Sequence, residues 1–99
     1  MKPAVLAPDA QAEVAAAAAW YEGRFAGLGE RFVSSIDDMV ARISELPEAF
    51  PVWDGNPRFR KAVVPRFPYV VFYVERVDVI EITAVAHTAR LPGYWRPRE

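Results

Sequence analysis

The chain has 99 residues, which is a usual length for one domain. Hydrophobic residues make up 53% and charged residues 25%, which indicates a globular chain and excludes a disordered one. There is no cysteine, so disulfide scaffolds, thiolate metal sites and cysteine nucleophiles are excluded. The longest uncharged apolar stretch, residues 14–21, is shorter than the roughly 20 residues of a membrane span, and no signal peptide is recognisable. We therefore expect a cytoplasmic protein with no membrane partner.

Charge is divided unevenly between the two halves of the chain. Residues 1–50 carry four basic and eight acidic side chains, whereas residues 51–99 carry eight basic and five acidic ones. This asymmetry indicates an electrostatic partner for the second half, or merely polar strand ends and turns that happen to be arginine.

The first quarter of the sequence predicts a short strand at residues 3–7 and a helix at residues 8–25. Pro8 suits the first position of a helix, where its missing N–H is not needed. The alanine run at residues 15–19 has high helix propensity, and its small side chains let another backbone approach the helix closely. Its simpler interpretation is tight packing on a sheet, and the alternative is a binding groove.

A second helix follows the turn at Gly27-Leu28-Gly29 and ends before Pro47. Its apolar residues fall at helical spacing and predict one buried stripe: Leu28, Phe32, Ile36, Met39, Val40, Ile43 and Leu46. Because only a few residues separate the two helices, they should form an antiparallel hairpin.

The second half predicts strands. Residues 50–53 are extended, residues 54–57 and 65–68 are turns, and residues 59–64, 69–75 and 79–86 are strands. In the last strand, strict alternation places one apolar set on a single face: Ile80, Ile82, Ala84 and Ala86. The expected fold is α+β, with an N-terminal strand and a helical hairpin on one face of an antiparallel sheet.

Four motifs in chain order carry a family resemblance: Trp20-Tyr21-Glu22, the segment at residues 27–32, Arg66-Phe67-Pro68-Tyr69, and the ending at residues 87–95. Together they resemble the RelE/ParE superfamily of bacterial type II toxins, also called plasmid stabilisation proteins, over essentially the whole chain. The resemblance implies a small domain with a helical hairpin against a twisted antiparallel sheet.

The resemblance also implies a partner and two alternative activities. A cognate antitoxin, ParD-like or RelB-like and encoded by the adjacent gene, would wrap around the toxin in a hetero-oligomer. RelE-like members cut messenger RNA in the ribosome, whereas ParE-like members inhibit DNA gyrase and have no known catalytic site. A third alternative is a non-toxic scaffold that only binds its antitoxin.

Ribonuclease activity would need a base, cations for the phosphorane charge and an acid. The residues that match such a role by resemblance are Lys61, Arg66, His87, Arg90 and Tyr94. However, Val63, Val70 and Thr88 stand where basic residues are expected, and the His-x-x-Arg-x-Pro ending is nearer to ParE-like sequences. The sequence therefore favours the ParE-like activity, without a confident catalytic residue.

Two candidate surfaces follow from the resemblance and the charge pattern. The target-binding candidates are the basic and aromatic residues Arg58, Arg60, Arg66, Arg90 and Trp95, although the arginines could be ordinary strand-edge charges. The antitoxin-binding candidates are Ala15, Ala18, Tyr21 and Arg60. Trp95 should either dock on the domain or wait for a partner.

No cofactor or metal is expected. His87 is the only histidine, and its simpler interpretation is a hydrogen-bonded residue at a strand end. The sequence also has no glycine-rich phosphate loop.

Overall fold

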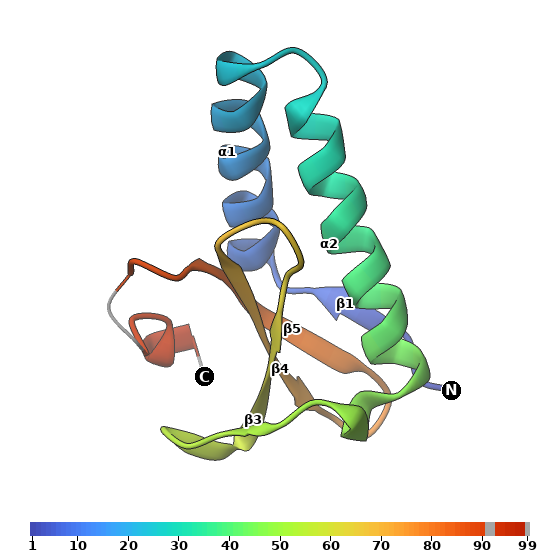
Figure 1. Cartoon of the computed structure of the whole chain (residues 1–99). Coiled ribbons are helices and arrows are strands. Elements are labelled where there is room, and N and C mark those ends of the chain that lie inside the picture. Colours follow the sequence, from blue (N-terminus) through green and yellow to red (C-terminus); the bar gives the residue numbers. More distant parts are fainter. Residues whose placement is uncertain (91–92, 99) are drawn as a thin grey trace.

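In residues 1–90 and 93–98, which the computed structural model describes, the chain forms two α-helices, five strands and two short 3₁₀ helices. Figure 1 shows the two helices side by side, rising from a sheet. The predicted α+β fold, with its N-terminal strand, is confirmed. In chain order the elements are β1 (Ala4–Leu6), α1 (Pro8–Arg24), α2 (Leu28–Glu45), η1 (Pro47–Ala49), β2 (Val52–Trp53), β3 (Asn56–Val63), β4 (Tyr69–Glu75), β5 (Ile80–His87) and η2 (Arg96–Arg98).

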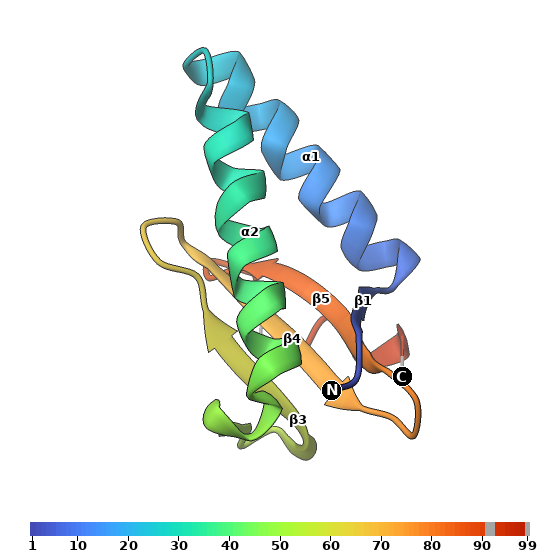
Figure 2. The ribbon, with the colours of Figure 1, turned by 90° about the vertical axis from the view of Figure 1, so that its right-hand side faces the viewer.

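The five strands form one sheet in the order β1-β5-β4-β3-β2. Strands β2 to β5 are antiparallel neighbours, as predicted, whereas β1 lies beside β5 and runs parallel to it (Figure 2). Tight hairpins join only antiparallel strands, and most of the chain separates β1 from β5, so no turn dictates their direction. The sheet is therefore mixed at this one edge.

The helical hairpin forms as predicted, and its turn is held by a side chain of α1. Gly27 has a φ of 88°, a left-handed conformation that glycine adopts without strain. The Glu22 carboxylate accepts hydrogen bonds from the N–H groups of Gly27 and Gly29, at 2.9 and 3.0 Å. These bonds satisfy backbone N–H groups that have no partner within α2, and the negative charge of Glu22 also interacts favourably with the positive end of the α2 dipole.

The apolar side chains of β5 switch from one face of the sheet to the other partway along the strand. Ile80 and Ile82 pack toward the helices, whereas Ala84 and Ala86 lie on the opposite face. The pairing of β5 with β4 skips Thr83, which forms a bulge. One extra residue shifts the alternation of side chains by one position. The prediction that all four apolar residues share a face is therefore wrong.

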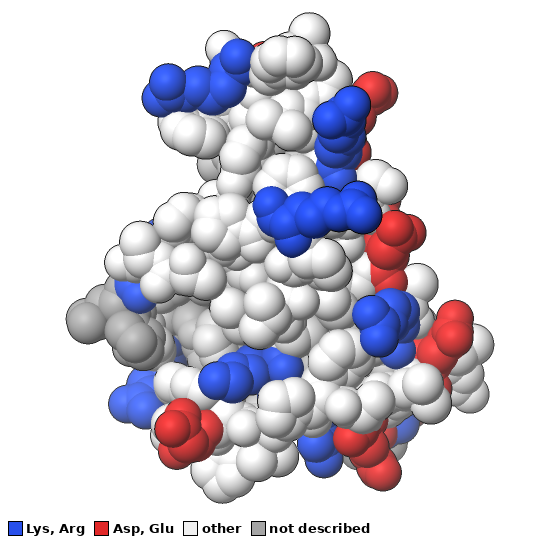
Figure 3. Space-filling view, viewed as in Figure 1, with Lys and Arg blue, Asp and Glu red and all other residues white. Residues whose placement is uncertain are grey.

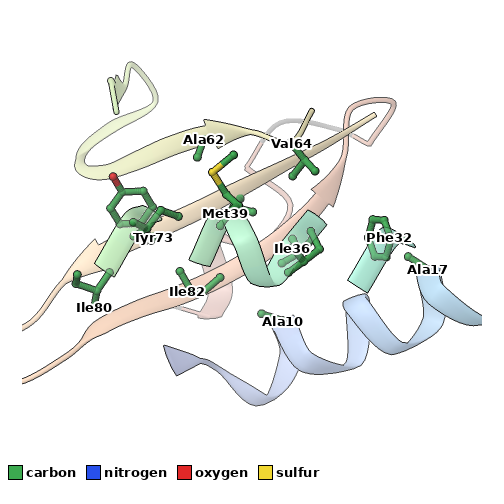
Figure 4. Close-up of a cluster of buried hydrophobic side chains, with 13 residues drawn as sticks. Ala10, Ala17, Phe32, Ile36, Met39, Ala62, Val64, Tyr73, Ile80 and Ile82 are labelled. Atoms are coloured by element: carbon green, nitrogen blue, oxygen red, sulfur yellow. The ribbon is translucent and has the colours of Figure 1, made fainter. Parts of the chain in front are cut away.

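Buried side chains form two clusters, one on each face of the sheet. The larger cluster joins the helices to the sheet and includes Phe32, Ile36, Met39 and Ile43 from the predicted stripe of α2 (Figure 4). Leu46, the last residue of that predicted stripe, is 64% exposed because α2 ends at Glu45. The smaller cluster lies on the other face, under the C-terminal segment, and consists of Trp53, Phe59, Phe72, Val74, Ala84, Ala86 and Trp95.

Some boundaries differ from the prediction. Strand β3 begins at Asn56 rather than Phe59, because a two-residue turn at Asp54-Gly55 joins it to β2. Pro57 is tolerated there, since the pairing of β3 with β4 starts only at Phe59. In the described part of the chain, neither helix has the length and apolar character that a membrane crossing requires.

Candidate functional site

The C-terminal segment covers the sheet face that the helices leave open. We call residues 88–90 and 93–98 the tail. Trp95 is 1% exposed, and its ring centroid lies 4.8 Å from the rings of both Phe59 and Phe72. Of the two expectations for Trp95, docking on the domain is therefore the one observed. A ring buried in this way has almost no surface left for contact with a target.

Glu13 of α1 fixes the tail to the sheet. Its Oε1 accepts hydrogen bonds from the Val85 N–H at 2.9 Å and from Arg98 Nη1 at 3.0 Å. Its Oε2 accepts from Arg98 Nη2 at 3.1 Å and from the Tyr94 hydroxyl. Arg98 also donates to the Thr83 carbonyl at 3.3 Å. Because β1 pairs with β5 only as far as Ile82, these two side chains satisfy backbone groups at an edge that β1 leaves uncovered.

Electrostatic effects stabilise the hydrogen bonds among Glu13, Tyr94 and Arg98. Burial, and then the hydrogen bond to Glu13, raise the pKa of Tyr94 well above its usual range, so the hydroxyl keeps its proton. The hydrogen bonds to Glu13 likewise raise the pKa of Arg98. Tyr94 also lies under the Arg90 guanidinium, whose carbon is 3.8 Å from the ring centroid. Tyr94 is therefore a neutral anchor of the tail.

Between the tail and the sheet lies a cavity of about 200 Å³, which we call the tail cavity. Strands β3, β4 and β5 and the tail all contribute to its lining. Its lining includes Lys61, Val70, Phe72, Ala86, His87 and Arg90. Its position follows from the bulge, because the change of face at Thr83 turns the small side chain of Ala86 toward the tail.

Among the residues that the structure describes, the tail cavity is lined by the cations Lys61 and Arg90 and by no carboxylate. Among residues 1–90 and 93–98, neither Lys61 nor Arg90 has an ion-pair partner. His87 Nδ1 accepts a hydrogen bond from the Ala89 N–H at 2.9 Å, so in neutral His87 the proton lies on Nε2. This bond confirms the expectation of a hydrogen-bonded histidine at the strand end. The cavity is therefore suited to an anionic ligand.

Four of the five ribonuclease candidates meet at the tail cavity: Lys61, His87, Arg90 and Tyr94. The fifth, Arg66, lies instead in the turn between β3 and β4, with a φ of 71°, beside Asp38 and Arg42 of α2. His87 is the candidate base at the cavity. The neighbouring carboxylate of Glu13 is occupied by Tyr94 and Arg98.

The target-binding candidates do not form one surface. Arg60 Nη1 donates to the Phe50 carbonyl at 2.7 Å, near the end of α2. Lys61, the next residue of β3, lines the tail cavity on the opposite face. Arg58 is exposed on the same strand. Of the predicted set, Arg90 and the buried Trp95 line the cavity.

The antitoxin-binding candidates are also dispersed. Ala15 is exposed on α1, whereas Ala18 lines an open groove between α1 and α2. Tyr21 packs among aromatic rings, 5.3 Å from Phe32 and 5.1 Å from Phe67 by ring centroids. Arg60 lies on β3, two strands away from the β5 strand on which α1 packs.

Sequence reasoning missed Glu13 and the ion pair that it forms with Arg98. The signal was present, because Ala10, Glu13 and Ala17 follow a helical spacing that places the carboxylate on the buried face of α1. A charged residue on such a face needs a partner. Nothing in the local sequence, however, identifies that partner as a residue of the tail.

Figure 3 shows the charges on one face of the molecule, where Asp and Glu gather mainly along the α2 side and Lys and Arg are more dispersed. Across residues 1–90 and 93–98, no three His, Cys, Asp or Glu side chains are grouped so that they could hold a metal ion.

Comparison with known proteins gives a family and a fold neighbour. A solved structure titled as a chromosomal ParDE toxin-antitoxin system from P. aeruginosa matches with a TM-score of 0.65 and 16% identity, over 88% of this chain and 96% of that chain. No curated protein sequence matches. The family model described as the ParE toxin of the type II toxin-antitoxin system parDE matches residues 4–92. The chain therefore belongs to the ParE toxin family of type II toxin-antitoxin systems.

Proposed function

We propose that the chain is the toxin of a type II toxin-antitoxin pair, that it inhibits DNA gyrase, and that a cognate antitoxin from the adjacent gene neutralises it. The observation that carries the proposal is the ParE toxin family match over residues 4–92. The fold shared with a ParDE system structure supports it. The expected assembly is a hetero-oligomer of toxin and antitoxin.

The site geometry supports inhibition by binding rather than by catalysis. Among residues 1–90 and 93–98, no carboxylate lines the tail cavity, so its candidate base is His87, and Arg66 lies elsewhere. Tyr94, a candidate acid, has a raised pKa and a hydroxyl that donates to Glu13. Acid–base catalysis works best with groups that titrate near the operating pH.

The antitoxin would cover the exposed part of α1, where Ala15 and Ala18 leave a thin surface beside the groove between the helices. A segment that folds as it binds buries on the order of 1,000–3,000 Å². Tyr21 and Arg60 would contribute only the parts of their side chains that remain exposed, since both side chains already have partners within the chain.

The test is a supercoiling assay with purified gyrase. The chain should block the conversion of relaxed plasmid to supercoiled plasmid, or trap cleaved DNA, and an equimolar amount of the antitoxin should restore activity. A chain that binds the antitoxin but leaves gyrase fully active would refute gyrase as the target. The same chain without any toxicity in cells would be the antitoxin-binding scaffold.

One observation favours ribosome-dependent RNA cleavage as a second candidate function. Lys61, His87, Arg90 and Tyr94, which the sequence assigned to that activity, do meet at one cavity. A cell-free translation reaction distinguishes the two functions. A ribonuclease would cut the messenger at ribosomal A sites and leave gyrase unaffected, and a gyrase inhibitor would leave the messenger intact.

A further inference from the structure

The tail cavity combines an apolar interior with a positively charged rim. Its volume of about 200 Å³ suits one large side chain rather than a whole small-molecule ligand, for which pockets of roughly 300–1,000 Å³ are usual. Val70 and Ala86 line it, and Lys61, His87 and Arg90 lie around it. A ligand that fits must therefore bring both an apolar group and negative charge.

The apolar surface continues beyond the cavity along β3 and β4. Val63 is 65% exposed and pairs with Val70 across the two strands. Val63 lies two residues after Lys61 on the same strand, so both side chains are on the face of the tail. The apolar surface therefore extends from the cavity to an exposed valine on β3.

The aromatic rings around the cavity have little free surface. Trp53, Phe72 and Trp95 are all buried, and the Tyr94 ring is covered by the Arg90 guanidinium. Proteins bind single-stranded nucleic acid largely by stacking bases on accessible aromatic faces. The accessible lining here is aliphatic, which favours an aliphatic side chain over a nucleobase.

We propose that the tail cavity is the docking site of an acidic peptide segment of the antitoxin. One large aliphatic side chain of that segment fills the space between Val70 and Ala86, and its carboxylates lie against Lys61 and Arg90. This inference rests on the proposed function, which names the antitoxin as the partner. It adds a second contact region, on the opposite side of the sheet from the helical hairpin.

The first experiment is isothermal titration of the purified chain with the product of the adjacent gene. Lys61→Glu and Arg90→Glu reverse a charge at the cavity and should each weaken binding by roughly tenfold or more. The matched control is Arg76→Glu, an equal charge change at an exposed residue at the far end of β4, which should leave the affinity within about twofold. Thermal unfolding of each variant verifies that it is folded.

The second experiment identifies the segment and tests the nucleic-acid alternative. Overlapping 12-residue peptides that span the antitoxin are titrated against Trp20→Phe, so that fluorescence reports only Trp53 and Trp95 beside the cavity. A peptide with acidic residues around a Leu, Ile or Met should change the emission, and replacing that residue by Asn should abolish the change. A 12-nucleotide single-stranded RNA is titrated in parallel.

Three results would overturn the inference. Unchanged antitoxin affinity of Lys61→Glu and Arg90→Glu would overturn it while leaving the proposed function intact. Binding of the RNA at the concentration at which the peptides fail would instead assign the cavity to nucleic acid. Failure of the unmodified chain to bind the antitoxin at all would refute the antitoxin part of the proposed function as well.

Discussion

Single residues decide how the tail is held, and Glu13 is the most connected of them. Its carboxylate joins α1, the edge of β5 and two residues of the tail, Tyr94 and Arg98. All of these groups are partly buried, so their hydrogen bonds are shielded from water and removing one partner leaves the others unsatisfied. The position of the tail, and with it the tail cavity, therefore depends on one carboxylate of the first helix.

Replacing Glu13 by Gln should lower the free energy of unfolding by about 1–3 kcal/mol, because the partly buried Arg98 loses its ion pair with Glu13 and keeps only the longer one with the exposed Asp9, while the shape of the side chain at position 13 is kept. Urea unfolding of the purified chain measures the change. The control is Glu75→Gln, which breaks the exposed ion pair with Lys2 at 2.8 Å and should change stability by less than about 1 kcal/mol. Equal urea midpoints for Glu13→Gln and the unmodified chain would show that the tail is not held by Glu13.

At the scale of elements, most of the fold was predictable where the signal is local. The stripe of α2 follows from helical spacing, and the start of α1 follows from the proline at its first position. The face of Ala84 and Ala86 was not predictable, because the bulge at Thr83 exists only in the pairing with β4. The docking of Trp95 was likewise undecided, since it depends on a face of the sheet formed by distant residues.

The same distinction applies to the candidate site. Sequence reasoning found four of the cavity residues by resemblance, and the structure brings them together. Arg60 and Lys61 are adjacent in sequence, so their side chains point to opposite faces of β3. The sequence alone did not show which of the two faces the cavity. It placed Arg66 with them as well, whereas the turn between β3 and β4 directs that residue toward α2.

The contact between the two helices gives a prediction at this scale. A Cβ on Gly29 would lie 2.6 Å from the Ala18 carbonyl oxygen of α1, closer than two such atoms can approach. Gly29→Ala should therefore destabilise the chain by about 1–3 kcal/mol, although alanine normally favours a helix. Gly23→Ala is the matched control, because nothing lies within 4 Å of its added Cβ, and it should stabilise the chain by up to about 1 kcal/mol. Thermal unfolding compares the two, and a stabilised Gly29→Ala would mean that the helices are not in such close contact.

On the scale of the whole molecule, the two faces of the sheet are covered differently: the helices pack on one, and the tail packs on the other. The helices and their cluster of buried residues provide most of the core on one face. On the other face, a smaller core under the tail borders a cavity whose cations, Lys61 and Arg90, have no ion-pair partner within the described part of the chain. The excess of basic residues in the second half of the chain is thus partly gathered at one place, where a partner of opposite charge can reach it.

The central claim, that this ParE family member is a gyrase-directed toxin controlled by its antitoxin, is tested most directly by inducing the chain in bacterial cells with and without the adjacent gene. We predict that the chain alone arrests division, gives filamentous cells and triggers the DNA-damage response while protein synthesis continues, and that co-expression of the antitoxin restores growth. An immediate stop of translation with cleaved messenger RNA, or unimpaired growth at the same level of expression, would contradict the claim.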